Sequence, residues 1–338
     1  IVKNLSLKGF NLQANLNGGL LAGTVNGTVS NITTDATSRI AGVKSTVLFT
    51  TCKGEHMGGI AGLVNPAGRI ENCTNRATVE GLKYAGGIAG YSATTGNPVI
   101  TGCVNYGTVT GTAPQEYTQT GTSQPTPKPI EVYAGGIAGQ LSGTATNCVN
   151  HGLVTMSSNN NAVGGIAGST YSATTIDGCV NYGEVTARNY SAGGIVGETA
   201  NTTSLKANMI QNCRNYGVIS GINCLGGILG RVPDNASTAT ITNCTNTGWL
   251  TGYTPTAANI GSISGYWNTG STYTNCRYDT CMSNVPAVMK ADREGAAGVR
   301  TTDIAPSGLY PVPAFATDSL VQLYTVPVIY KVPCTRYN

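Results

Sequence analysis

Short apolar segments alternate with glycine-containing and polar turns along most of the chain. In residues 84–111 the apolar segments are Gly86–Tyr91, Val99–Cys103 and Thr108–Thr110. They are rich in β-branched residues and are separated by turns that contain Gly or Asn, which is typical of short strands. No stretch keeps the 3.6-residue spacing of an amphipathic helix, so we expect very little helix. The pattern predicts three short strands in each such unit.

This unit returns along the chain. A G-G-I-x-G segment begins at residues 58, 86, 135, 164, 193 and 226. Each copy then carries a cysteine followed two residues later by an asparagine. The cysteines are Cys73, Cys103, Cys148, Cys179, Cys213 and Cys244, and the asparagines are Asn75, Asn105, Asn150, Asn181, Asn215 and Asn246. Self-similarity at a spacing of roughly 20–50 residues predicts a solenoid, a propeller or another repeat array.

The length of the repeat decides between these architectures. Three short strands suit one coil of a parallel β-helix, whereas a propeller blade needs four antiparallel strands in a longer repeat. Parallel crossover connections are right-handed as a rule. We therefore predict an all-β fold, a right-handed parallel β-helix of about eight coils. It spans residues 1–281, and residues 282–338 form an irregular C-terminal cap or extension.

We expect the interior to consist of ladders of residues that recur at one place in each copy. The isoleucines of the G-G-I segments stack inside, and the asparagine amides hydrogen-bond from coil to coil. The cysteines act as small core residues with free thiols, because coils about 4.8 Å apart do not suit a disulfide. Cys281 and Cys334 lie off this ladder and are the pair most suited to a bridge. The coil is closed by Val109, Val154, Val185, Val218 or Ile219, and Leu250.

Composition and charge restrict the classes of partner. Charged residues make up 10% of the chain, and the net charge of +4 comes from scattered Lys and Arg, so no basic stripe suggests nucleic acid or an anionic membrane. No apolar run is long enough to span a membrane as a helix. The chain begins at Ile1 without Met, and we interpret it as a processed or trimmed form.

Two insertions interrupt the repeats. Thr112–Val132 contains several prolines and is expected to leave the coil as a loop, since proline cannot donate to a β-ladder. Ala200–Asn208 is a shorter polar bulge. Loops that leave one side of a solenoid often carry its binding function.

The copies G-G-I-A-G…I-T-G-C-V-N-Y-G-T-V-T-G, the opening I-V-K-N-L-S-L-K-G and the later N-C-R-Y-D-T…G-V-R-T-T-D-I resemble GLUG-motif repeats in a cysteine-bearing variant. The resemblance covers about residues 1–304. It implies a large surface-exposed or secreted bacterial protein, in the manner of adhesins and of the non-catalytic regions of secreted peptidases. It brings no catalytic motif and no ligand.

Parallel β-helices also carry polysaccharide-degrading enzymes, which need converging carboxylates or a base beside a cation. The acidic candidates do not recur as a cluster, and we interpret each as a solvated surface carboxylate: Glu71, Glu80, Asp177, Glu184 and Glu198. The only histidines are His56 and His151. No spacing of Cys, His or Asp matches a metal site, so no cofactor is expected.

The position after each ladder asparagine is the most suggestive of binding. Alternation along a strand turns this position outward if the asparagine points inward. It holds Arg76, Tyr106, His151, Tyr182, Tyr216 and Thr247 in successive copies. Flat amphipathic rings in a row could stack on the faces of sugars, so Tyr106, His151, Tyr182 and Tyr216 are the candidate ligand-binding residues. The alternative is that these rings cap the turn and shield the coil.

These observations favour a non-catalytic, adhesin-like protein of the bacterial surface or of the extracellular medium. It would present an elongated face, or the Thr112–Val132 loop, to a glycan or a host surface protein. The alternatives are a polysaccharide lyase or hydrolase on the same scaffold, and a structural stalk or filament subunit that associates through its ends.

Overall fold

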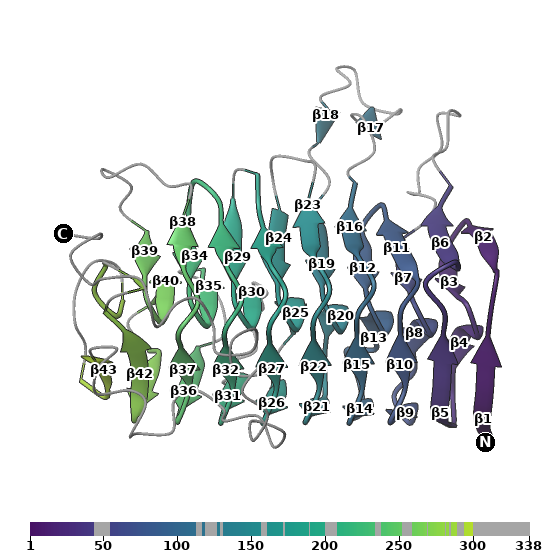
Figure 1. The fold of residues 1–338 in the computed structure, drawn as a ribbon, viewed down its shortest axis with the longest axis horizontal. Helices are drawn as coiled ribbons and strands as arrows, with labels where there is room; N and C mark the ends of the chain where they lie inside the picture. The colour runs from purple at the N-terminus through teal and green to yellow at the C-terminus, as the bar shows by residue number, and fades with distance from the viewer. Residues whose placement is uncertain are drawn as a thin grey trace, which may run out of the picture.

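The computed structural model describes residues 1–43, 55–112, 117–118, 127–128, 131–156, 161–171, 173–188, 190–199, 208–233, 238–251, 259–268, 270–280, 282–283, 285–288 and 294–299. The described residues contain strands and no helix, and the coils stack side by side into one elongated column (Figure 1). The predicted fold is confirmed: parallel strands form a β-solenoid of about seven turns.

Four parallel sheets make the walls of the solenoid, and Figure 1 shows their strands. Sheet B holds β2 (Asn11–Ala14), β6 (Arg39–Gly42), β11 (Thr78–Gly81), β16 (Val109–Gly111), β23 (Val154–Met156), β28 (Val185–Thr186), β33 (Ile219–Ser220) and β38 (Leu250–Thr251). Sheet C holds β3 (Asn17–Gly19), β7 (His56–Gly58), β12 (Tyr84–Gly86), β19 (Val132–Gly135), β24 (Asn161–Gly164), β29 (Ser191–Gly193), β34 (Leu225–Gly226) and β39 (Ile260–Gly261). Sheet D holds β4 (Ala22–Val25), β8 (Ala61–Val64), β13 (Ala89–Ser92), β20 (Ala138–Leu141), β25 (Ala167–Thr170), β30 (Val196–Thr199), β35 (Leu229–Arg231) and β40 (Ser264–Tyr266).

Sheet A is longer, because most coils contribute two strands to it. Its strands are β1 (Val2–Leu7), β5 (Thr28–Thr34), β9 (Arg69–Glu71), β10 (Thr74–Asn75), β14 (Val99–Thr101), β15 (Val104–Asn105), β21 (Thr144–Thr146), β22 (Val149–Asn150), β26 (Thr175–Asp177), β27 (Val180–Asn181), β31 (Asn208–Gln211), β32 (Arg214–Asn215), β36 (Ala239–Thr242), β37 (Thr245–Asn246), β41 (Thr272–Thr274), β42 (Cys276–Asp279) and β43 (Ala296–Val299). Outside the solenoid walls, β17 (Tyr117–Thr118) and β18 (Pro127–Lys128) form an antiparallel pair within the predicted loop insertion, and Figure 1 shows them projecting from the column.

The prediction of three strands per coil is wrong, since a coil such as residues 84–111 holds five short ones. The expected strand Gly86–Tyr91 is divided into β12 and β13 by a tight bend. A β-carbon on Gly86 would lie 1.9 Å from the carbonyl oxygen of Ala89, so only glycine permits this bend. The expected strand Val99–Cys103 is divided at Gly102, whose φ of 61° is left-handed.

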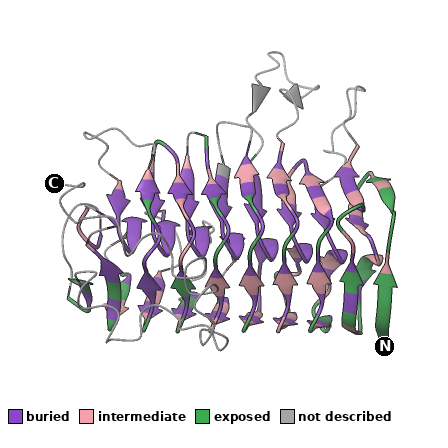
Figure 2. Ribbon diagram, viewed as in Figure 1, coloured by how far each residue is buried: buried purple, intermediate pink, exposed green. Residues whose placement is uncertain are grey.

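The core follows the predicted ladders. The isoleucines of the G-G-I segments are fully buried together with the cysteines, and the residues that close the coil pack in a second cluster, where Ile219 rather than Val218 is buried. Figure 2 shows this buried interior along the column, with exposed residues mostly at β1 and β2 and near β43. One coil cannot cover its own apolar face, so stability comes from stacking.

The described part of residues 282–338 lies against the last coil. Strand β43 pairs in parallel with β42, and Val288 bridges to Ser264. The remainder of the predicted extension lies outside the described residues, as do Cys281 and Cys334 with their proposed bridge. Within the described residues no helix long and apolar enough to cross a membrane is found.

Candidate functional site

An internal ladder of asparagine amides runs through the solenoid. The six ladder asparagines are fully buried, and the Nδ2 of each of the first five donates to the Oδ1 of the next, as in Asn150 to Asn181 (2.9 Å) and Asn181 to Asn215 (2.8 Å). The same Nδ2 also donates to the carbonyl two residues on, as in Asn181 to Gly183 (2.8 Å). The ladder begins at Thr34, whose hydroxyl donates to Asn75, and the residue paired with Asn246 in the next coil is Tyr278.

The ladder accounts for two of the recurring glycines. A β-carbon on Gly194, the second glycine of its G-G-I segment, would lie 2.3 Å from Asn215 Cγ, and one on Gly217 would lie 2.7 Å from Asn181 Nδ2. The amides, together with the carbonyls of Gly227 and Gly183 at 2.1 and 2.0 Å, therefore fill the space that side chains at these glycines would need. The recurring N-x-G spacing is the feature of the sequence from which this contact could have been predicted.

The cysteine ladder is interior as well. The described cysteines are free, and the six ladder thiols are fully buried. Their sulfurs donate to backbone carbonyls, as in Cys213 to Gln211 (3.1 Å). Burial raises the pKa of the Cys213 thiol well above its usual range and raises that of Cys276 to about 12. The Cys213 and Cys276 thiols therefore stay protonated and act as packing groups.

The predicted aromatic row lies on the outside of the solenoid, directly after the short strands β15, β22, β27 and β32. We call it the stacked row: Tyr106, His151, Tyr182 and Tyr216. Neighbouring ring centroids are 4.8, 4.9 and 5.0 Å apart, with interplanar angles of 4°, 4° and 14°. The Arg76 guanidinium covers the Tyr106 ring at 4.4 Å. The spacing of the rings equals the spacing of the coils, because the strands are in register.

This geometry corrects the expected mode of binding. The inner rings cover one another face to face, so their faces are not open for stacking on sugars, and the row presents ring edges and polar ring atoms to solvent. Tyr106 and Tyr182 are 44% and 42% exposed, whereas Tyr216 is half-buried. The series of outward-facing side chains also ends earlier than predicted, because Thr247 is fully buried.

A second row of side chains crosses sheet D, and the sequence did not single it out. Its register runs through Tyr91, Gln140, Ser169, Glu198, Arg231 and Tyr266. We call it the sheet D row. Leu141, the neighbour of Gln140 on β20, belongs to the core cluster, so alternation turns the row away from that cluster. Gln140, Ser169 and Glu198 are nevertheless buried.

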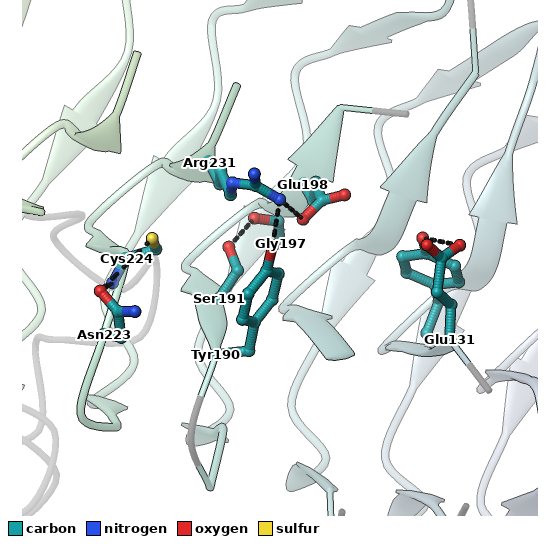
Figure 3. A network of polar contacts seen from close by, with 9 residues as sticks. Glu131, Tyr190, Ser191, Gly197, Glu198, Asn223, Cys224 and Arg231 are labelled. Atoms are coloured by element: carbon teal, nitrogen blue, oxygen red, sulfur yellow. Dashed lines mark hydrogen bonds and ion pairs between the residues drawn. The ribbon is translucent and has the colours of Figure 1, made fainter. Parts of the chain in front are cut away.

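Glu198 is the centre of this row and corrects another expectation. It is not a solvated carboxylate, since only 7% of the residue is exposed. Its Oε2 accepts a hydrogen bond from Arg231 Nη1 at 3.1 Å, and the same Nη1 donates to the Tyr190 hydroxyl (Figure 3). Burial outweighs the attraction of Arg231 and raises the pKa of Glu198 to about 7.

Aromatic side chains of sheet C border one end of the sheet D row. The rings of His56 and Tyr91 stack with centroids 4.7 Å apart, Tyr84 meets Tyr91 edge-on at 5.0 Å, and Tyr133 stacks on Tyr84 at 5.7 Å. Tyr133 donates to the exposed Glu131 (3.0 Å), which Figure 3 shows beyond Glu198 along the row. Burial lowers the pKa of His56 to about 4, so this imidazole is neutral at physiological pH.

The other acidic candidates stay apart from this cluster. Glu80 pairs with Arg39 (2.8 Å) and Glu71 with Arg69 (2.8 Å), all with partly exposed side chains. Asp177 accepts from Gln211 and Asn212, and Glu184 from Thr186. Across the described residues, no group of three or more His, Cys, Asp or Glu side chains could hold a metal ion.

Comparisons with known proteins give one similarity in structure. No protein-family model matches the chain, and no curated protein matches it. Among solved structures, the chain is similar to the crystal structure of a "putative immunoglobulin A1 protease from Bacteroides ovatus", with 16% sequence identity and a TM-score of 0.49 over 87% of this chain and 81% of that one. The resemblance to GLUG repeats stays a prediction.

Proposed function

We propose that this chain is the repeat region of a non-catalytic, adhesin-like bacterial protein, extracellular or on the cell surface, that binds a glycan or a host surface protein along an outward face of the solenoid. The observation that carries the proposal is the stacked row. Its four polar rings are held at even intervals of 4.8 to 5.0 Å on consecutive coils. A row of equal, weak contacts suits a long repeating ligand, for which each further contact adds to avidity.

The ligand would be held by ring edges and not by ring faces. The phenol hydroxyls and the imidazole are hydrogen-bonding groups on an apolar body, which is a common feature of recognition surfaces. Burial within the stack lowers the pKa of His151 and raises those of Tyr182 and Tyr216, so these groups would act as neutral hydrogen-bonding partners.

The test separates binding from a purely structural role of the rings. Tyr182→Phe with Tyr216→Phe keeps the stack and removes two hydroxyls, whereas Tyr182→Ala with Tyr216→Ala removes the rings. Each protein is applied to a glycan array and to host-cell surface proteins, and its thermal unfolding is recorded. We expect the Phe pair to unfold like the parent and to lose at least tenfold in retention, about 1.4 kcal/mol. If both double variants retain the ligand as well as the parent does, the stacked row takes no part in binding.

A polysaccharide lyase or hydrolase is the second candidate, and Glu198 is the observation that favours it. A buried carboxyl with a raised pKa beside a cation and a phenol is a common feature of acid–base sites. Such an enzyme would release reducing ends or unsaturated products from a polysaccharide panel and would lose this activity on Glu198→Gln. A stalk or filament subunit, the third candidate, would sediment as a polymer and retain no glycan.

A further inference from the structure

The stacked row has an arginine at each of its two ends. The Arg76 side chain is exposed, and its guanidinium lies over the Tyr106 ring at 4.4 Å. Arg214 is exposed as well and comes two residues before Tyr216. Its positive charge lowers the pKa of Tyr182 and Tyr216 against the effect of burial. Both cations therefore belong to the same surface as the rings.

The register of sheet A fixes the distance between the two arginines. Asn75, which precedes Arg76, is paired coil by coil with Asn105, Asn150, Asn181 and finally Asn215, which follows Arg214. With coils about 4.8 Å apart, these four steps separate the arginines by about 19 Å along the column. Between them, the row and the positions two residues before it hold no acid, and their side chains are Val104, Tyr106, Val149, His151, Val180 and Tyr182.

Arg76 differs from three other arginines in having no acidic partner. Arg39, Arg69 and Arg231 each form an ion pair with a glutamate, whereas no acid in the described part of the chain pairs with Arg76. Contact with a ring uses the flat face of a guanidinium and leaves the N–H groups at its edge for hydrogen bonds. Glu184, the acid beside the row, already accepts a hydrogen bond from a threonine on its own strand. The surface therefore complements an anion.

The spacing of the rings favours a glycan over a peptide as the anionic ligand. An extended peptide presents the side chains of one face about every 6.7 Å, whereas neighbouring ring centroids in the stacked row are 4.8 to 5.0 Å apart. A peptide lying along the column would fall out of step with the row within two coils. The phenol hydroxyls and the imidazole at the ring edges can exchange hydrogen bonds with sugar hydroxyls.

The small number of cations restricts the kind of glycan. A densely sulfated glycan or a nucleic acid is bound by clusters of Lys and Arg, which this surface lacks. A single guanidinium holds a carboxylate through two parallel hydrogen bonds. We propose that the ligand of the stacked row is a linear glycan with carboxylate groups, a polyuronate, which lies along the column with one carboxylate at Arg76 and another at Arg214. This inference rests on the proposed function and adds the chemical class of the ligand.

The experiment is calorimetric titration of the full chain with oligogalacturonate, oligomannuronate and the methyl ester of each, which has the same sugars without the charge. The variants are Arg76→Gln and Arg214→Gln. Arg69→Gln is the matched control, because it removes the same charge from an exposed side chain of the same coil as Arg76 but outside the row. We expect one of the acids to bind about tenfold more tightly than its ester, and each row variant to weaken its Kd about fivefold, about 1 kcal/mol, with Arg69→Gln changing it by less than about twofold.

The outcomes separate this inference from the proposed function. Equal binding of acid and ester, an equal loss on Arg69→Gln, no binding of either uronate probe, or tighter binding of polyglutamate or of a heparin fragment would overturn the carboxylate assignment. If acid and ester bind alike and Tyr182→Phe with Tyr216→Phe still loses both, the stacked row binds a neutral glycan, and only the inference about charge fails. If that pair of Phe substitutions and the pair of Ala substitutions bind every probe as the parent does, the proposed function fails with it.

Discussion

The asparagine ladder offers the sharpest test of what holds the solenoid together. In Asn181→Ala, one amide is removed from the middle of the ladder. Asn150 loses the acceptor that it contacts at 2.9 Å, and Asn215 loses the donor at 2.8 Å. The carbonyl of Gly183 also loses its contact with Nδ2, at 2.8 Å.

The magnitude follows from these three lost contacts. Each buried hydrogen bond contributes about 1 kcal/mol net, and leaving its partner unsatisfied adds to the cost. The atoms that lose a partner each keep one local hydrogen bond, Asn150 Nδ2 to the Gly152 carbonyl and Asn215 Oδ1 from the Gly217 amide, which limits that added cost. We expect Asn181→Ala to lower the free energy of unfolding by about 4 kcal/mol.

Asn246→Ala is the matched control at the end of the ladder. Asn246 accepts from Asn215 at 2.8 Å and from the Gly248 amide at 3.1 Å, and its own Nδ2 makes only a long contact of 3.4 Å to Gly248. It has no asparagine beyond it, so its removal should cost about 2 kcal/mol.

The assay is urea unfolding followed by circular dichroism, together with amide hydrogen exchange around each substituted coil. Hydrogen exchange is needed because a repeat array can lose coils from one end without unfolding as a whole. A loss below about 1 kcal/mol for Asn181→Ala, or an equal loss for both variants, would refute the idea that the amides act as a connected ladder.

Three further predictions concern single positions. Glu198 has a pKa of about 7 in the folded chain against 4.5 for the free side chain, so the folded state holds its proton more tightly, and stability should fall by about 3 kcal/mol as pH rises from 4.5 to 7. Thermal unfolding against pH should show this decline in the parent and not in Glu198→Gln. Gly194→Ala should cost about 1–3 kcal/mol by urea unfolding, because its β-carbon would lie 2.1 Å from the Gly227 carbonyl oxygen and 2.3 Å from Asn215 Cγ, and a cost near zero would contradict the packing. In native protein treated with maleimide, mass spectrometry should find Cys213 and Cys276 unmodified until urea is added, since both thiols are buried and protonated.

The stacked row shows how much of the candidate site the repeat pattern could predict. Period-two alternation predicted that Tyr106 and Tyr182 point outward, and both are exposed. Alternation says nothing about the angle of a ring around its side-chain bonds. In-register stacking turned the rings face to face, so the faces of the inner rings are closed to the sugar stacking that the sequence suggested.

The sequence by itself determined the solenoid, its interior ladders and the outward direction of the stacked row. Each of these features repeats, and stacking of equal coils needs only that the same residue type returns at the same place. The tertiary structure alone decided the cluster of Glu198, Arg231 and Tyr190. These residues do not recur from copy to copy, so no period reveals them, and only the register of β30 with β35 brings the carboxyl to the guanidinium. Their burial, which raises the pKa of Glu198, likewise depends on neighbours from several coils and not on any local pattern.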